Sequence, residues 1–135
     1  MNSRYMLDTN TASYAIKGNS LNVRSNLQKV AIAAVCISAV SEAELRFGVL
    51  RKHNPPKLAT GLDVFLTGVG SLPWDSAAAV SYARLRVAME EKGTPIGNID
   101  IMIAAHALSI DAVLVTHDHV FRHIRDLRLE DWALP

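Results

Sequence analysis

The sequence predicts an α/β fold in which helices cover both faces of a mainly parallel central sheet. Along the chain, the hydrophobic period switches repeatedly between that of a short buried strand and that of a helix. Each strand-like segment is separated from the next by at least one helix-like segment, which is the pattern of parallel strands joined by helical crossovers. No internal repeat or low-complexity tract interrupts this alternation.

The first 74 residues are expected to supply three strands and four helices. The run "VCISAV" is apolar and rich in β-branched residues, as buried strands are. The pair Gly18-Asn19 stops one helix, and "HNPP" stops another because proline cannot continue it. In order, the expected elements are a strand over 5–7, helices over 11–17 and 21–28, a strand over 35–40, helices over 41–52 and 57–66, and a short strand within 68–74.

The remaining residues are expected to supply the longest helix and the second half of the sheet. Asp75 is the predicted N-cap of this helix, which spans 75–92 and stops at Gly93. The segment "TPIGN" indicates a loop. After it we expect a helix over 99–110, a strand over 112–116, a short helix over 120–124 and a final strand over 127–129.

Length and composition restrict the class of protein. With 135 residues, of which 50% are apolar and 20% charged, residues 1–135 are expected to fold as one domain. Cys36 has no partner for an internal disulfide, which favours a buried thiol in a cytoplasmic protein. The apolar run 30–37 is too short to span a membrane, and no signal-peptide core follows Met1. The formal net charge of +1 means that any basic surface is local.

Four carboxylates are expected at the carboxyl edge of the sheet, where ligands of such folds collect. They follow strands or open the helix that leads into one: Asp8, Glu44, Asp100 and Asp118. Grouped acids repel one another, and a divalent cation removes that repulsion because Mg²⁺ and Mn²⁺ take hard oxygen ligands. The sequence therefore predicts metal-assisted hydrolysis of a phosphate ester.

Each of these acids also has a purely structural interpretation at the start of a helix. Side-chain oxygens at such positions accept backbone N–H groups, and first-turn carboxylates complement the helix dipole. The alternatives are an N-cap at Asp8, a capping box of Ser41 with Glu44, a first-turn charge at Asp100 behind an Asn98 cap, and an N-cap at Asp118. A Glu44 side chain folded back onto its own cap would be unavailable to a metal, so for this residue the two interpretations compete.

The basic residues near these acids suggest contacts to phosphate. The expected phosphate contacts are Arg46, His117, His119 and Arg122. His119 and His123 are spaced i, i+4 and would bind Zn²⁺ together only on a regular helix with further ligands. His106 lies among apolar residues of one helical face and is expected to be a hydrogen-bonded core residue.

Several motifs together resemble the PIN-domain ribonucleases, specifically the VapC toxins of VapBC toxin-antitoxin systems. The resemblance covers almost the whole chain through "YMLDTN", "ISAVSEAELRFGV", "GTPIGNIDIMIAAHAL", "AVLVTHDHVFRHI" and "LRLEDW". It implies a three-layer α/β/α fold and an acidic site that binds Mg²⁺, or Mn²⁺, and cuts RNA.

The resemblance also assigns roles residue by residue. Asp8 in "LDTN" and Asp100 in "IGNIDIMIAAH" match the principal metal-binding acids, and Glu44 in "AELRFG" matches the second acid. Asp118 departs from the pattern "TxNxxEF" common among similar proteins, because that pattern has Asn at its position and Glu where this chain has Val120. The residues that match the polar surroundings of the family's site, and are expected to support it, are Thr9, Asn10 and Thr116.

The resemblance further implies partners. It implies a homodimer, a VapB-type antitoxin whose tail crosses the active-site groove, and a structured RNA substrate, with the anticodon loop of the initiator tRNA as the leading candidate. The helical apolar residues that exceed the needs of one core, and that fit burial by a partner, are Tyr14, Ile16, Leu45, Phe47 and Leu50.

Two functions of other classes remain open from the residues alone. A Mg²⁺-dependent phosphatase or phosphoacceptor domain also places an Asp after its first strand. Position 10 is Asn rather than a second Asp, which disfavours that interpretation. The other is a PIN-like binding module with an inactive site, which the presence of all four acids disfavours.

Overall fold

The computed structural model describes residues 3–135, and five strands in this range form a single sheet. The strands are β1 (Tyr5–Leu7), β2 (Val35–Ser38), β3 (Gly70–Leu72), β4 (Val113–Val115) and β5 (Leu129–Glu130). Their order is β3-β2-β1-β4-β5, and every pair is parallel. Strands β2 and β3 lie on one side of β1, and β4 and β5 lie on its other side, so the strand order reverses at β1.

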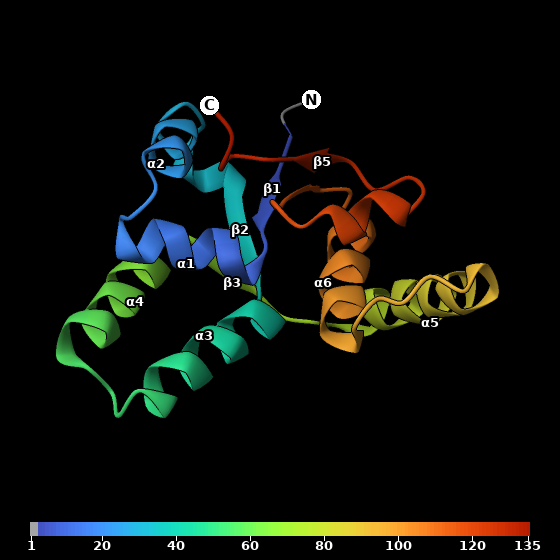
Figure 1. The fold of residues 1–135 in the computed structure, drawn as a ribbon, viewed down its shortest axis with the longest axis horizontal. Coiled ribbons are helices and arrows are strands. Elements are labelled where there is room, and N and C mark those ends of the chain that lie inside the picture. Colours follow the sequence, from blue (N-terminus) through green and yellow to red (C-terminus); the bar gives the residue numbers. More distant parts are fainter. Residues whose placement is uncertain (1–2) are drawn as a thin grey trace.

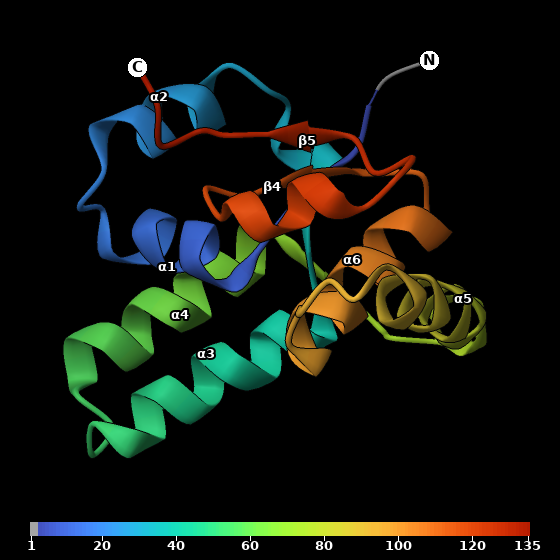
Figure 2. The same cartoon turned by 45° about the vertical axis from the view of Figure 1, so that its right-hand side comes forward.

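Helices pack on both faces of this sheet and make the three predicted layers (Figure 1, Figure 2). On one face lie α1 (Thr9–Lys17), α2 (Leu21–Gln28) and α4 (Pro56–Gly68), and on the other lie α5 (Ser76–Lys92) and α6 (Asn98–Ser109). Helix α3 (Ala39–Arg51) extends from the end of β2. Two 3₁₀ helices, η1 (Ile32–Ala34) and η2 (His119–His123), complete the chain. Within residues 3–135, no helix has the length and apolarity needed to cross a lipid bilayer.

The alternating side chains of the three central strands divide the core into two clusters. One cluster packs beneath α5 and α6 and takes Met6, Cys36 and Leu114. The other packs beneath α1, α2 and α4 and takes Leu7, Ile37 and Val115. Because these strands are covered on both faces, all their residues except the partly buried Tyr5 are buried, which explains the short continuous apolar runs in the sequence. Cys36 is buried and free, as expected.

Most differences from the predicted boundaries follow from residues that cap helices. Helix α1 begins at Thr9 because Asp8 caps it, and β2 stops at Ser38 because the Ser38 hydroxyl accepts the Val40 N–H and starts α3. The final strand starts two residues later than expected and ends one residue later, beyond a turn in which Asp126 has a positive φ of 67°. Asp75 and Gly93 bound α5 as predicted.

His106 is the buried polar residue that joins α6 to the start of α3. Its side chain is 2% exposed, and its Nδ1 lies 2.8 Å from Ser38 Oγ, in a hydrogen bond. Burial lowers the pKa of His106, and the negative charge of Asp75 opposes this shift. The expectation of a hydrogen-bonded core histidine is therefore confirmed.

We expect His106→Ala to lower the free energy of unfolding by about 2–4 kcal/mol, because it leaves a cavity and an unpaired Ser38 hydroxyl. Since the folded state favours neutral His106, its contribution is present above the ordinary pKa of 6.5 and is lost as the pH falls through the lowered pKa. Urea unfolding at pH 7.5 and pH 5 measures both effects. Ser109→Ala, on the same helix, should change stability by less than about 0.5 kcal/mol. Equal losses in the two variants would contradict the assignment.

Candidate active site

Asp8 lies at the carboxyl end of β1, beside the point where the strand order reverses. The Asp8 N–H donates to the Val115 carbonyl at 3.0 Å, which fixes its backbone against β4. Its carboxylate is 6% exposed, and both oxygens are engaged: Oδ1 accepts the Thr11 N–H at 2.9 Å, and Oδ2 accepts the Thr116 hydroxyl at 2.6 Å. The capping interpretation of Asp8 is therefore correct, and the cap holds the carboxylate at the sheet edge.

Thr116 connects Asp8 to the segment that carries Asp118. The Thr116 hydroxyl donates to Asp8 and accepts the Asp118 N–H at 3.0 Å. Asp118 Oδ1 in turn accepts the Val120 N–H at 3.0 Å and caps η2, as the structural alternative predicted. Asp118 is exposed, so its side chain is accessible to solvent.

Glu44 belongs to the second turn of α3 and makes no capping box with Ser41. That interpretation is wrong because Ser38 caps the helix and Ser41 lies inside it, fully buried. The Thr9 hydroxyl instead hydrogen-bonds to Glu44 Oε1 and lies 3.1 Å from Ser41 Oγ. The Glu44 carboxylate is therefore held toward α1 and the residue that follows Asp8.

Asp100 lies in the first turn of α6, whose N-cap is Gly97 rather than Asn98. Burial raises the pKa of Asp100, and so do, in decreasing order, the negative charges of Asp118, Glu44 and Asp8. The structure thus brings the other three acids within electrostatic reach of Asp100. Within residues 3–135, none of the four forms an ion pair with Lys, Arg or His.

The donor chemistry of this cluster fits a hard divalent cation. Four carboxylates from four separate elements offer only oxygen ligands, which Mg²⁺ and Mn²⁺ prefer. In the described residues no three such side chains already enclose a cation site, so ligation requires side-chain rotation. Glu44 and Asp100 are partly exposed and Asp118 is exposed, so their side chains have room to rotate. Glu44 and Asp118 would give up their hydrogen bonds from Thr9 and from the Val120 N–H in doing so, whereas Asp8 is buried and held through both oxygens.

The predicted phosphate contacts divide into two groups. His117, His119 and Arg122 line a hollow of about 200 Å³ together with Thr116 and Asp118. Arg46 lies two residues from Glu44 but pairs with Glu42 at 2.7 Å, so the structure does not bring it to the acidic cluster. His119 and His123 lie on a 3₁₀ helix, where residues spaced i, i+4 do not share a face, so they are not placed to bind one Zn²⁺ ion together.

Two polar contacts at the site had no counterpart in the sequence interpretation. The contact of Ser41 with Thr9 joins residues 32 positions apart, and the capping interpretation of Ser41 does not predict it. His117 Nδ1 pairs with Asp131 Oδ2 at 2.7 Å across the end of β5. Asn10 is exposed and lines a groove of about 240 Å³ with Thr9 and Glu44. No pattern of spacing predicts such contacts between separate elements.

Comparison with known proteins relates this chain to one family over nearly its whole length. The PIN domain profile matches residues 5–127, a range that contains all four carboxylates. The chain is 36% identical over 130 residues to Ribonuclease VapC2 of Rickettsia felis, covering 95% of this chain and 97% of that protein. It is 33% identical over 131 residues to the tRNA(fMet)-specific endonuclease VapC of Salmonella typhimurium, covering 96% and 98% respectively. The solved structure of DNA-bound VapBC from Salmonella typhimurium matches with a TM-score of 0.90 and 32% identity, over 97% of this chain and 99% of that chain.

Proposed function

The chain belongs to the PIN-domain family and to its VapC ribonucleases, and on this premise we propose that it is a metal-dependent endoribonuclease, the toxin of a type II toxin-antitoxin system. The observation that carries the proposal is the meeting of four carboxylates, without a cationic partner among residues 3–135, at the sheet edge. A protein that only bound RNA would have no use for this repulsion, whereas a nuclease that recruits Mg²⁺ or Mn²⁺ requires it.

In this proposal Asp8 and Asp100 are the principal ligands of the cation, Glu44 completes the ligand set, and Asp118 contacts it directly or through water. The cation, when bound, neutralises charge on the scissile phosphate and promotes attack by water. Thr116 and Thr9 orient the carboxylates of Asp8 and Glu44 through their hydrogen bonds. Asn10 is assigned the same supporting role, at the rim of the groove that Glu44 lines.

The substrate and partners follow from the relatives. We assign a tRNA as the substrate, with the anticodon loop of tRNA(fMet) as the leading candidate. The VapC proteins of Salmonella typhimurium and Shigella flexneri, each 33% identical to this chain, are tRNA(fMet)-specific endonucleases. A VapB-type antitoxin and a second copy of this chain are the expected partners. Phe47 and Leu50, which are 61% and 68% exposed, offer them an apolar surface. Residues 1–135 act in the cytoplasm as one nuclease domain.

The proposed activity predicts both metal dependence and the chemistry of the product ends. Protein freed of antitoxin should cut bulk bacterial tRNA in Mg²⁺ or Mn²⁺, and EDTA should abolish cleavage. Because water rather than the ribose 2′-OH attacks the phosphate, the products should carry 5′-phosphate and 3′-hydroxyl ends. Ligation-based sequencing of 5′ ends, with and without enzymatic phosphorylation, identifies the cut position and the end chemistry. Absence of cleavage in both metals, or 5′-hydroxyl ends, would refute the proposal.

A further inference from the structure

A groove of about 670 Å³ runs between α5 and the segment that follows η2, away from the acidic cluster. Its floor is apolar and includes Leu85 and Met89 of α5 and Leu108 of α6. Its rim carries three cations, Arg84, Lys92 and Arg125, and two carboxylates, Glu91 and Asp126. None of the proposed metal ligands or supporting residues lines this groove, so the site above does not account for it.

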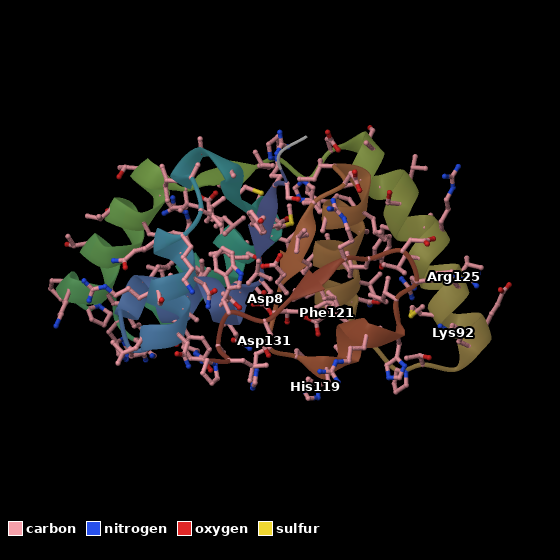
Figure 3. The ribbon with its side chains drawn as sticks, turned by 90° about the horizontal axis from the view of Figure 1, so that it is seen from above. Asp8, Lys92, His119, Phe121, Arg125 and Asp131 are labelled. Carbon is pink, nitrogen blue, oxygen red and sulfur yellow. The ribbon has the colours of Figure 1, made fainter. Side chains whose placement is uncertain are left out.

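The groove is joined to the acidic site by short, fixed connections. Lys92 Nζ donates to the His123 carbonyl at 2.9 Å, which ties the end of α5 to η2. Helix η2 begins directly after Asp118, and only residues 93–97 separate Lys92 from α6, whose first turn holds Asp100. In Figure 3, Phe121 of η2 lies between Asp8 and the labelled pair Lys92 and Arg125. A strand that leaves the acidic site over η2 therefore reaches the rim of the groove.

The charges along this path favour an anion. The groove rim and η2 together present four cations, Arg84, Lys92, Arg122 and Arg125, against the two rim carboxylates. Within residues 3–135, the three arginines among them have no carboxylate within 4 Å. These four cations and two carboxylates give the path a local formal charge of about +2, whereas the whole chain has a net charge of +1. Unpaired guanidinium groups at the edge of an apolar floor suit phosphates with bases lying between them.

We propose that this groove, bounded by Arg84, Lys92 and Arg125, binds the sugar-phosphate backbone of a single-stranded RNA segment that flanks the scissile bond. The inference rests on the proposed ribonuclease function and specifies the surface on which part of the RNA substrate lies. The guanidinium groups of Arg84 and Arg125 contact phosphates, and Lys92 holds the groove open by its bond to η2. Leu85 and Leu108 contact the bases without selecting among them, so the groove contributes affinity rather than sequence preference.

The test measures RNA binding separately from cleavage. An Asp8→Asn background prevents turnover and keeps a capping side chain. Fluorescence anisotropy with labelled 12-nucleotide and 5-nucleotide oligouridine compares this parent with Arg84→Gln/Arg125→Gln. We expect the Kd for the 12-mer to rise about tenfold and its log–log salt slope to shrink by about 1.4, since each lost phosphate contact accounts for about 0.7. The 5-mer should bind nearly as before. Arg24→Gln, an exposed arginine on α2 without an ion pair, is the matched control and should change neither quantity.

Each contrary outcome is distinct. An unchanged Kd and slope for the 12-mer, an equal loss with Arg24→Gln, or failure of the parent to bind the 12-mer would overturn the proposal. A change in sedimentation coefficient with unchanged RNA affinity would make the groove a protein interface instead. Cleavage of tRNA by the otherwise wild-type chain is assayed in parallel. If cleavage fails while the groove variant still loses RNA affinity, the proposed function falls and the RNA groove stands.

Discussion

Asp8→Asn should fold like the wild type and lose RNA cleavage by about 10³-fold, because it removes a metal ligand worth several kcal/mol in the transition state. The side chain of Asn retains an oxygen that accepts the Thr11 N–H, so the N-cap of α1 survives. Its amide nitrogen cannot accept the Thr116 hydroxyl as Asp8 Oδ2 does, but it can donate to the hydroxyl oxygen instead. Its amide group no longer offers the charge that binds a cation. Single-turnover cleavage of tRNA in Mg²⁺, together with thermal unfolding, measures the two properties separately.

A pair of further variants separates the capping role of Asp8 from its chemistry. Asp8→Ala should lose cleavage as fully as Asp8→Asn and should also lose about 1–2 kcal/mol of stability, because the cap is gone and the Thr116 hydroxyl has no hydrogen-bonding side chain at position 8. Asp75→Asn is the control, since Asp75 caps α5 through the Ala78 N–H but lies outside the acidic cluster. If Asp8→Asn cut RNA at the wild-type rate, Asp8 would be a structural cap and nothing more.

The sheet was predictable because its strands are short, apolar and separated by helices that stop at recognisable residues. Gly18 and Gly93 both adopt the left-handed conformation that ends a helix, at φ 64° and 67°, which is why those two boundaries were predicted correctly. Start positions were harder, since several neighbouring Ser, Thr, Asp and Asn residues compete to cap. Ser38 rather than Ser41 caps α3, and this choice depends on where β2 leaves the sheet.

The sequence predicts the positions of the site residues but not the contacts between them. The positions of the four acids follow from the order of strands, because a parallel sheet collects the ends of its strands at one edge. Their contacts do not follow, because the Thr9 bond to Glu44 and the Thr116 bond to Asp8 join residues 35 and 108 positions apart. At Asp8 the cap is compatible with the proposed metal ligation, since each carboxylate oxygen accepts one hydrogen bond and keeps a further lone pair.

Asp100→Asn should abolish cleavage and yet stabilise the metal-free protein. Burial and the charges of Asp118, Glu44 and Asp8 raise the pKa of Asp100 above its ordinary 3.8, so its negative charge is unfavourable in the folded state. The contribution of Asp100 to stability is therefore fully present below its ordinary pKa of 3.8, and it is lost as the pH rises through the raised pKa. At pH 7 we expect the variant to unfold about 1–3 °C higher than the wild type, a small shift because the group is only half buried and solvent screens it.

Two measurements test the direction of this stability change and its cause. Thermal unfolding should show the gain at pH 7 and its disappearance as the pH falls below the ordinary pKa of 3.8, whereas Asp63→Asn on the exposed face of α4 should show neither. Titration with Mg²⁺ should raise the unfolding temperature of the wild type more than that of Asp100→Asn, because at a given concentration a ligand stabilises the folded state more when it binds more tightly. A destabilised variant at pH 7 would mean that Asp100 stabilises α6 by its first-turn charge. An equal Mg²⁺ response in both proteins would mean that Asp100 does not bind the metal.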